Sequence, residues 1–83
     1  MSLRETVFTP HFLRQADALP ERSRLRAFAY VLELADEADP GRLAEADPDV
    51  PHVWLLHRFD VTISCAVYDD VMRVEALTVR ANG

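Results

Sequence analysis

Three residues in the C-terminal part of the chain have side chains that could act together on a phosphate, namely His57, Arg73 and Glu75. Histidine changes its protonation near neutral pH, so His57 could serve as a general acid or base. Glu75 could orient the imidazole ring, and Arg73 could hold a phosphate oxygen. The alternative is that all three are ordinary solvated residues that pair with neighbours across strands. The alternation of side chains along the strands decides whether they share a face.

The other reactive residue types give no second candidate site. Histidines, acids and the single cysteine show no spacing typical of metal ligands, so we expect no metal and no cofactor. The only glycines are Gly41 and Gly83, which excludes a glycine-rich phosphate loop. Cys65 falls in the aliphatic row of a predicted strand, and we interpret it as a buried small hydrophobe rather than a nucleophile.

Charge is distributed unevenly along the chain, whose net charge is −5. Residues 1–26 carry five arginines and three acids, whereas residues 33–49 carry seven acids and one arginine. An acidic protein repels phosphate at long range, which disfavours nucleic acid as the direct partner. Arg22, Arg24 and Arg26 could dock an acidic partner, or they could form a solvated helix face.

Length and composition narrow the class of protein. A chain of 83 residues that is 49% hydrophobic suits one globular domain, which we assign to residues 1–83. No apolar run approaches the roughly 20 residues that cross a bilayer, and the N-terminus lacks the pattern of a signal peptide, so we expect no membrane association. A single cysteine cannot form an internal disulfide, which favours a reducing, cytoplasmic location.

Hydrophobic patterning and turn residues predict an α+β fold. Thr9 and Pro10 are typical of a helix start, with Thr9 as the N-cap. Residues 38–52 hold three prolines and indicate a loop with one helical turn around Arg42–Ala46. The predicted elements are a strand at 3–9, helices at 10–19 and 20–38, and strands at 53–58, 61–68 and 71–80, with turns at 59–60 and 69–70. This β-α-α-β-β-β order packs two helices on one face of a small, mainly antiparallel sheet.

The second predicted helix has an apolar face close to an i, i+3, i+4, i+7 stripe, formed by Leu25, Phe28, Ala29, Leu32 and Ala35. Its arginines and its acids lie at opposite ends. Acids at the C-terminal end of a helix oppose its dipole, so we expect that end to be weak.

Side-chain parity assigns the two faces of the sheet. In residues 61–68 an aliphatic row (Val61, Ile63, Cys65, Val67) alternates with a small polar row (Thr62, Ser64, Ala66, Tyr68). We expect the aliphatic row to face the helices. If Trp54 is in the core, His57, three positions further along the strand, points to the free face and lies near Thr62. In the last strand, parity turns inward Met72, Val74 and Ala76. The free face then gathers His57, Thr62, Ser64, Arg73 and Glu75, with Leu55, Phe59 and Leu77 as its apolar residues.

Two stretches, FTPHFLRQADALP and WLLHRFDVTISCAVYDDVMRVEALTVR, together with the β-α-α-β-β-β order, resemble the RelE/ParE superfamily of bacterial type II toxin–antitoxin systems. The resemblance implies a small cytoplasmic toxin that a cognate antitoxin neutralises. RelE-like members cleave mRNA on the ribosome and ParE-like members poison DNA gyrase, so either target is open. Arg80 lies where a RelE-like phosphate ligand would be, although a plain strand end fits it too.

Departures from the family pattern weigh against RNA cleavage. The W-R-L-R pattern of the ribonuclease branch is Trp54-Leu55-Leu56-His57 here, and the family arginine of the next strand falls on Thr62. Without clustered basic residues, a site stabilises the charge on a scissile phosphate poorly. The chain therefore resembles a ParE-like or degenerate member more than an active ribosome-dependent endoribonuclease.

Apolar residues on the free face suit a protein partner better than nucleic acid, and an antitoxin helix or added strand would cover them. The alternative function is a small protein-binding module on the same scaffold, without catalysis. The sequence leaves a homodimer open in either case.

Overall fold

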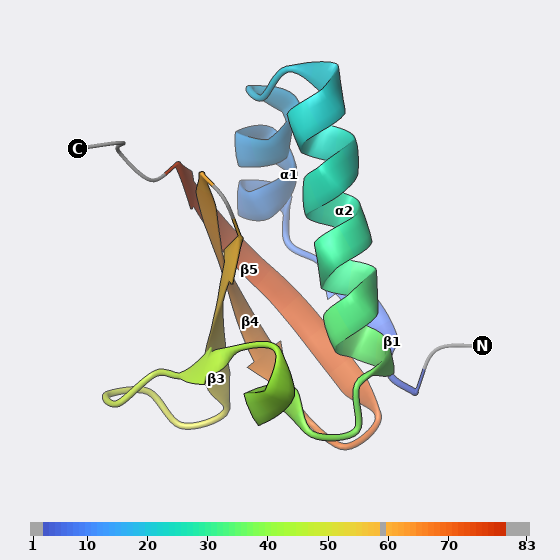
Figure 1. Ribbon diagram of the computed structural model, residues 1–83, viewed down its shortest axis with the longest axis vertical. Coiled ribbons are helices and arrows are strands. Elements are labelled where there is room, and N and C mark those ends of the chain that lie inside the picture. Colours follow the sequence, from blue (N-terminus) through green and yellow to red (C-terminus); the bar gives the residue numbers. More distant parts are fainter. Residues whose placement is uncertain (1–2, 59, 80–83) are drawn as a thin grey trace.

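The structure, a computed structural model, describes residues 3–58 and 60–79. Its elements follow in the order β1 (Glu5–Phe8), α1 (Pro10–Asp17), α2 (Glu21–Asp36), a 3₁₀ turn (Pro40–Arg42), β2 (Glu45–Ala46), β3 (Val53–Arg58), β4 (Val61–Val67) and β5 (Val71–Val79). The strands form one sheet in the order β1-β5-β4-β3-β2, in which β1 runs parallel to β5 and the other neighbours are antiparallel (Figure 1). The predicted α+β fold, with two helices packed against a mainly antiparallel sheet, is confirmed.

The loop predicted at 38–52 contains two short elements instead of one. The helical turn predicted at Arg42–Ala46 is wrong, because a 3₁₀ turn forms earlier, at Pro40–Arg42, and β2 then pairs with β3 as an extra edge strand. The carboxylate of Asp39 accepts a hydrogen bond from Gly41 N at 3.0 Å, which caps the turn at its start. This additional strand brings an acidic side chain to the sheet, as described below.

The start of α1 confirms the predicted N-cap. Thr9 Oγ1 accepts a hydrogen bond from Phe12 N at 3.1 Å, and a proline follows at the first helical position. The same hydroxyl donates to Glu75 O at 2.9 Å, while Gln15 Oε1 accepts from Leu77 N at 2.7 Å. Side chains of α1 therefore satisfy backbone groups of β5 beyond the point where the short β1 ends.

The buried face of α2 differs from the predicted one. It consists of Ala27, Val31, Leu34 and Ala35, which pack in the core. Of the predicted stripe, Ala35 is buried as expected and Phe28 is half-buried, whereas Leu25 and Leu32 are 61% and 47% exposed and Ala29 is also exposed. The prediction failed because α2 has apolar residues on two sides, and periodicity alone does not say which side the sheet covers.

A buried arginine holds the C-terminal end of α2. The guanidinium of Arg4, which is 8% exposed, donates to Glu37 O and Tyr68 O, both at 2.6 Å, and to Ala38 O at 3.5 Å. A cation next to the last carbonyls of a helix complements its dipole. The acid-rich end of α2 is thus tied to the N-terminal segment and to the β4–β5 turn.

The core lies between the helices and one face of the sheet (Figure 1). The aliphatic row predicted for β4 is buried along its whole length. On the helix side, Phe8, Phe12 and Phe28 form an aromatic cluster with ring centroids 5.2–5.7 Å apart. The predicted tight turn at 69–70 is also confirmed, since Tyr68 N donates to Val71 O at 2.9 Å.

A β-bulge changes the parity of β5. Ser64 lies opposite Ala76, but Cys65 lies opposite Val74, so Glu75 is the extra residue. Beyond the bulge each side chain faces the other way from the simple alternation. The prediction that Ala76 faces inward and Leu77 outward is therefore wrong: Leu77 is 3% exposed and belongs to the core.

Candidate functional site

The candidate site is the face of the sheet opposite the helices, which we call the open face. Register pairs His57 on β3 with Thr62 on β4, and Thr62 with Thr78 on β5. In the next row Leu55 lies opposite Ser64, and small side chains follow along β4. The prediction that His57 lies on this face beside Thr62 is confirmed.

His57 contacts two polar side chains on neighbouring strands. Its Nδ1 lies 3.0 Å from Thr62 Oγ1, and its Nε2 lies 3.4 Å from Glu45 Oε2. The ring is 39% exposed and the glutamate 73% exposed, so water reaches both groups. Thr62 and Glu45 together fix the ring plane and leave it on the surface of the sheet.

Arg73 and Glu75 form a second polar pair on β5. Arg73 Nε lies 3.4 Å from Glu75 Oε2, with side-chain exposures of 50% and 34%. The two residues are two positions apart on β5, which is the spacing that places side chains on the same face of a strand. The carboxylate neutralises the guanidinium that was predicted to hold a phosphate.

The structure does not bring the predicted residues into one cluster. Arg73 lies opposite Ala66, four positions along β4 from Thr62, which lies opposite His57. At about 3.3 Å per residue and 4.8 Å per strand, this register separates the Cα atoms of His57 and Arg73 by roughly 16 Å. The carboxylate next to the imidazole is that of Glu45 rather than Glu75. Arg80, the fourth candidate, lies outside the described residues.

Glu45 is the site residue that sequence reasoning missed. It lies in a segment that was predicted to be a loop, and its partner is twelve positions further along the chain. A two-residue strand leaves almost no periodic signal, since alternation needs about four residues to be recognised. Glu45 becomes visible only through its pairing with Leu55 in the sheet.

The second basic residue of β3 points to the helix side of the sheet. Arg58 Nη1 donates to Leu43 O at 3.3 Å and to His57 O at 2.9 Å, and its guanidinium lies 6.0 Å from the centroid of the Tyr30 ring. These contacts keep its charge away from the open face. Arg73 is therefore the one arginine on the open face within residues 3–58 and 60–79.

Cys65 has the inert environment that the sequence indicated. Its side chain is fully buried in the core, and no disulfide involves it among the described residues. Burial, reinforced by the negative charge of Glu75, raises the pKa of the thiol to about 12. At neutral pH the thiolate needed for nucleophilic attack is absent.

Apolar surface on the open face is smaller than predicted. Leu77 is in the core, Phe59 lies outside the described residues, and Leu55 remains as a half-buried side chain.

Within the part of the chain that the structure describes, no group of three or more His, Cys, Asp or Glu side chains could hold a metal ion. No helix in that part is long and apolar enough to span a membrane. Among the described residues, the open face therefore carries two polar pairs, His57 with Glu45 and Arg73 with Glu75, beside the half-buried Leu55.

No protein-family profile and no curated protein matches the sequence. Solved structures do match the fold. A chain of the RelBE2 toxin–antitoxin complex from Mycobacterium tuberculosis superposes with a TM-score of 0.82 at 16% identity, covering 99% of this chain and 97% of that one.

Two further complexes agree with this match. A chain of the Escherichia coli RelBE toxin–antitoxin complex gives a TM-score of 0.78 at 12% identity, over 96% of this chain and 99% of that one. A chain of the RelE–RelB complex from Pyrococcus horikoshii gives 0.76 at 14% identity, over 98% and 99%. The chain therefore has a RelE-like fold.

Proposed function

We infer that this chain is the toxin of a type II toxin–antitoxin pair, which a cognate antitoxin binds and neutralises in the cytoplasm. The observation that carries the proposal is the match of nearly the whole fold to chains of toxin–antitoxin complexes from a mycobacterium, an enterobacterium and an archaeon. At identities of 12–16%, the sequence has changed almost everywhere while the order and packing of the elements have not.

The open face supports a protein target over RNA cleavage. Cleavage of ribosome-bound mRNA needs cations placed where negative charge develops on the phosphate. Here the arginine of this face is neutralised by Glu75, the histidine lies beside Glu45, and the two pairs are far apart. A phosphate near either pair would meet a carboxylate. We therefore propose that the toxin acts by binding a protein such as DNA gyrase.

Growth and two in vitro assays test this proposal. The chain is expressed in bacteria with and without the product of the neighbouring gene, and we expect growth to stop only when it is expressed alone. Purified chain is then added to a translation reaction and to a gyrase supercoiling reaction. Inhibited supercoiling with intact mRNA is the expected result. Normal growth in both strains would contradict the toxin function.

Two variants locate the activity on the open face. If mRNA is cleaved instead, His57→Ala and Arg73→Ala should restore translation, whereas Arg14→Ala, an exposed arginine on α1, should not. If both open-face variants still cleave mRNA, the cleavage activity lies elsewhere on the molecule. This comparison tests whether cleavage depends on the open face, whereas the translation and supercoiling reactions decide between the RNA target and the protein target.

A second candidate function is a protein-binding module without catalysis or toxicity. The internal pairing of the polar groups on the open face favours it, since His57 and Arg73, the described basic residues of this face, each lie beside a carboxylate. A stable complex with the neighbouring gene product, combined with normal growth, would select this function over the toxin.

A further inference from the structure

The outer face of α2 carries apolar side chains that the core does not use. Leu25 and Leu32 are 61% and 47% exposed, and the exposed Ala29 lies between them. At the spacing i, i+4, i+7 these three residues form a line along the helix. At the N-terminal half of α2, Leu25 and Ala29 line a shallow hollow of about 460 Å³ together with Glu21, Arg22 and Arg26. An apolar line of this kind on a surface helix is typical of a helix–helix contact.

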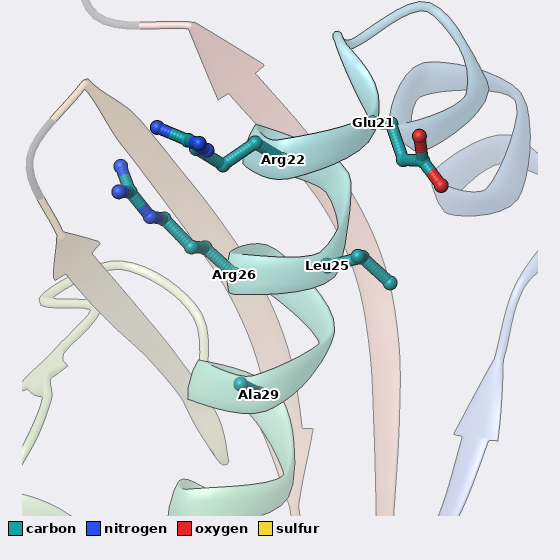
Figure 2. Close-up of a pocket in the computed structure, with 5 residues that line it drawn as sticks. All are labelled: Glu21, Arg22, Leu25, Arg26 and Ala29. Atoms are coloured by element: carbon teal, nitrogen blue, oxygen red, sulfur yellow. The ribbon is translucent and has the colours of Figure 1, made fainter.

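Charged side chains flank this line with opposite signs at its two ends. Arg22 and Arg26 belong to the N-terminal half of α2, and Figure 2 shows both extending to the same side, with Leu25 on the other side. Glu21, at the first residue of α2, lies on the side of Leu25 and is the one acid that lines this hollow. Glu33 and Asp36 belong to the C-terminal half, and both are exposed. The outer face of α2 thus has two arginines against one glutamate at its N-terminal end, apolar residues in the middle and two acids at its C-terminal end.

These charges are largely unused within the molecule. Arg24 is directed to α1, where it lies 4.0 Å from Asp17, but Arg22, Arg26 and Glu33 form no ion pair with any residue in 3–58 or 60–79. Asp36 accepts one hydrogen bond, from Leu3 N at 3.2 Å. A partner of complementary charge could therefore engage this face without breaking an internal ion pair.

We propose that α2 packs antiparallel against α2 of a second copy of this chain. An antiparallel arrangement about a two-fold axis near Ala29 places the basic half of each helix opposite the acidic half of the other. Arg26 then lies opposite Glu33 of the partner subunit, and Arg22 lies opposite Asp36 of the partner subunit. A parallel arrangement would oppose like charges at both ends.

The spacing along the helix fits this arrangement. Arg22 and Asp36 are both seven residues from Ala29, about 10 Å along the axis. In the antiparallel pair, Leu25 of one helix falls next to Leu32 of the other, so the apolar side chains interdigitate on both sides of the centre. The methyl group of Ala29 at the centre lets the two helices approach closely.

The predicted interface buries little surface area, so we expect a weak dimer. Stable protein interfaces bury at least about 1,200 Å² in total, and a single pair of four-turn helices covers less. We therefore expect a reversible dimer with a dissociation constant on the order of 10–100 µM. The open face lies on the opposite side of the sheet from α2, so it stays accessible in the dimer and the proposal does not depend on the toxin function.

Sedimentation equilibrium of the full chain at 5 µM to 1 mM (about the range that brackets such a dissociation constant) tests the dimer. We expect Arg26→Glu and Glu33→Arg each to weaken self-association by about tenfold or more, because each turns two attractive pairs into two repulsive ones. The double variant Arg26→Glu/Glu33→Arg should restore the wild-type dissociation constant. An equimolar mixture of the two single variants should form a heterodimer that neither forms alone.

Two controls separate this interface from other contacts. Arg14→Glu makes the same charge change on α1 and should leave self-association unchanged, whereas Leu25→Asp, at an exposed position, should abolish it without loss of helical circular dichroism. A wild-type chain that stays monomeric at 1 mM overturns the proposal. A wild-type dimer that persists in Arg26→Glu would also overturn the proposal. The same holds if the charge variants weaken only the binding of an antitoxin and leave self-association unchanged.

Discussion

Replacement of the buried Arg4 by alanine should cost more stability than replacement of any exposed charged residue in the described chain. The side chain is 8% exposed and makes two hydrogen bonds of 2.6 Å, to Glu37 O and Tyr68 O. Hydrogen bonds from a charged donor contribute about 1.5–3 kcal/mol each. Both hydrogen bonds are only partly buried, so the lower values apply, and we expect a loss of about 3 kcal/mol.

Urea denaturation followed by far-ultraviolet circular dichroism measures this loss. In thermal unfolding of a domain of this size, about 3 kcal/mol corresponds to a decrease in Tm of roughly 12–24 °C. Arg4→Lys keeps the charge but cannot donate to both carbonyls in the same geometry, so it should fall between wild type and Arg4→Ala. Arg14→Ala, an exposed arginine, should change the free energy of unfolding by less than about 0.5 kcal/mol.

A loss below about 1 kcal/mol in Arg4→Ala would refute the reasoning. It would mean that water replaces the guanidinium at both carbonyls at almost no cost. The same result would show that the N-terminal segment and the end of α2 are held together by packing, and that the contact between Arg4 and Tyr68 O follows from the fold without supporting it.

Three further outcomes are expected. Leu77→Ala should destabilise by about 2–5 kcal/mol and Leu25→Ala by less than about 0.5 kcal/mol in thermal unfolding, and equal losses would contradict the bulge. Thr9→Ala should cost about 1–2 kcal/mol in urea unfolding, largely restored by Thr9→Ser. Cys65, with its pKa raised from 9.0 to about 12, should react with a thiol reagent only after unfolding. Its contribution to stability is complete below about pH 9 and should decline by about 1.4 kcal/mol per pH unit above that, as the unfolded thiol ionises first.

Sequence patterns predicted the parts of this fold that depend on local chemistry. The N-cap at Thr9 follows from a hydroxyl followed by a proline, and the buried row of β4 follows from its aliphatic residues at every second position, although Ala66 of the other row is buried too. The position of His57 on the open face also follows, because β3 and β4 pair without a bulge between Val53 and Arg58. In each case the residues within a few positions contain the determining information.

The remainder depends on contacts between distant segments. The bulge at Glu75 flips the last part of β5, and its carbonyl is satisfied by Thr9, which no pattern in β5 reveals. The choice between the two apolar sides of α2 depends on how the sheet twists beneath it. The pairing of His57 with Glu45 needs an edge strand too short to be recognised. The sequence thus predicts on which face of the sheet the candidate site lies, but not which of its side chains contact one another.

The pairing of β1 with β5 makes the N-terminal elements depend on a strand that is made more than sixty residues later. Thr9, Gln15 and Arg4 find their partners 62 to 66 positions later in the sequence. A ribosome releases the N-terminal segment long before those partners exist, since translation adds only about 5–20 residues per second. The β3–β4–β5 meander can form by itself from neighbouring residues, whereas the first strand and helix must wait. Any nascent or truncated chain that lacks β5 therefore leaves its aromatic cluster without a sheet to cover, and exposes it to chaperones and proteases.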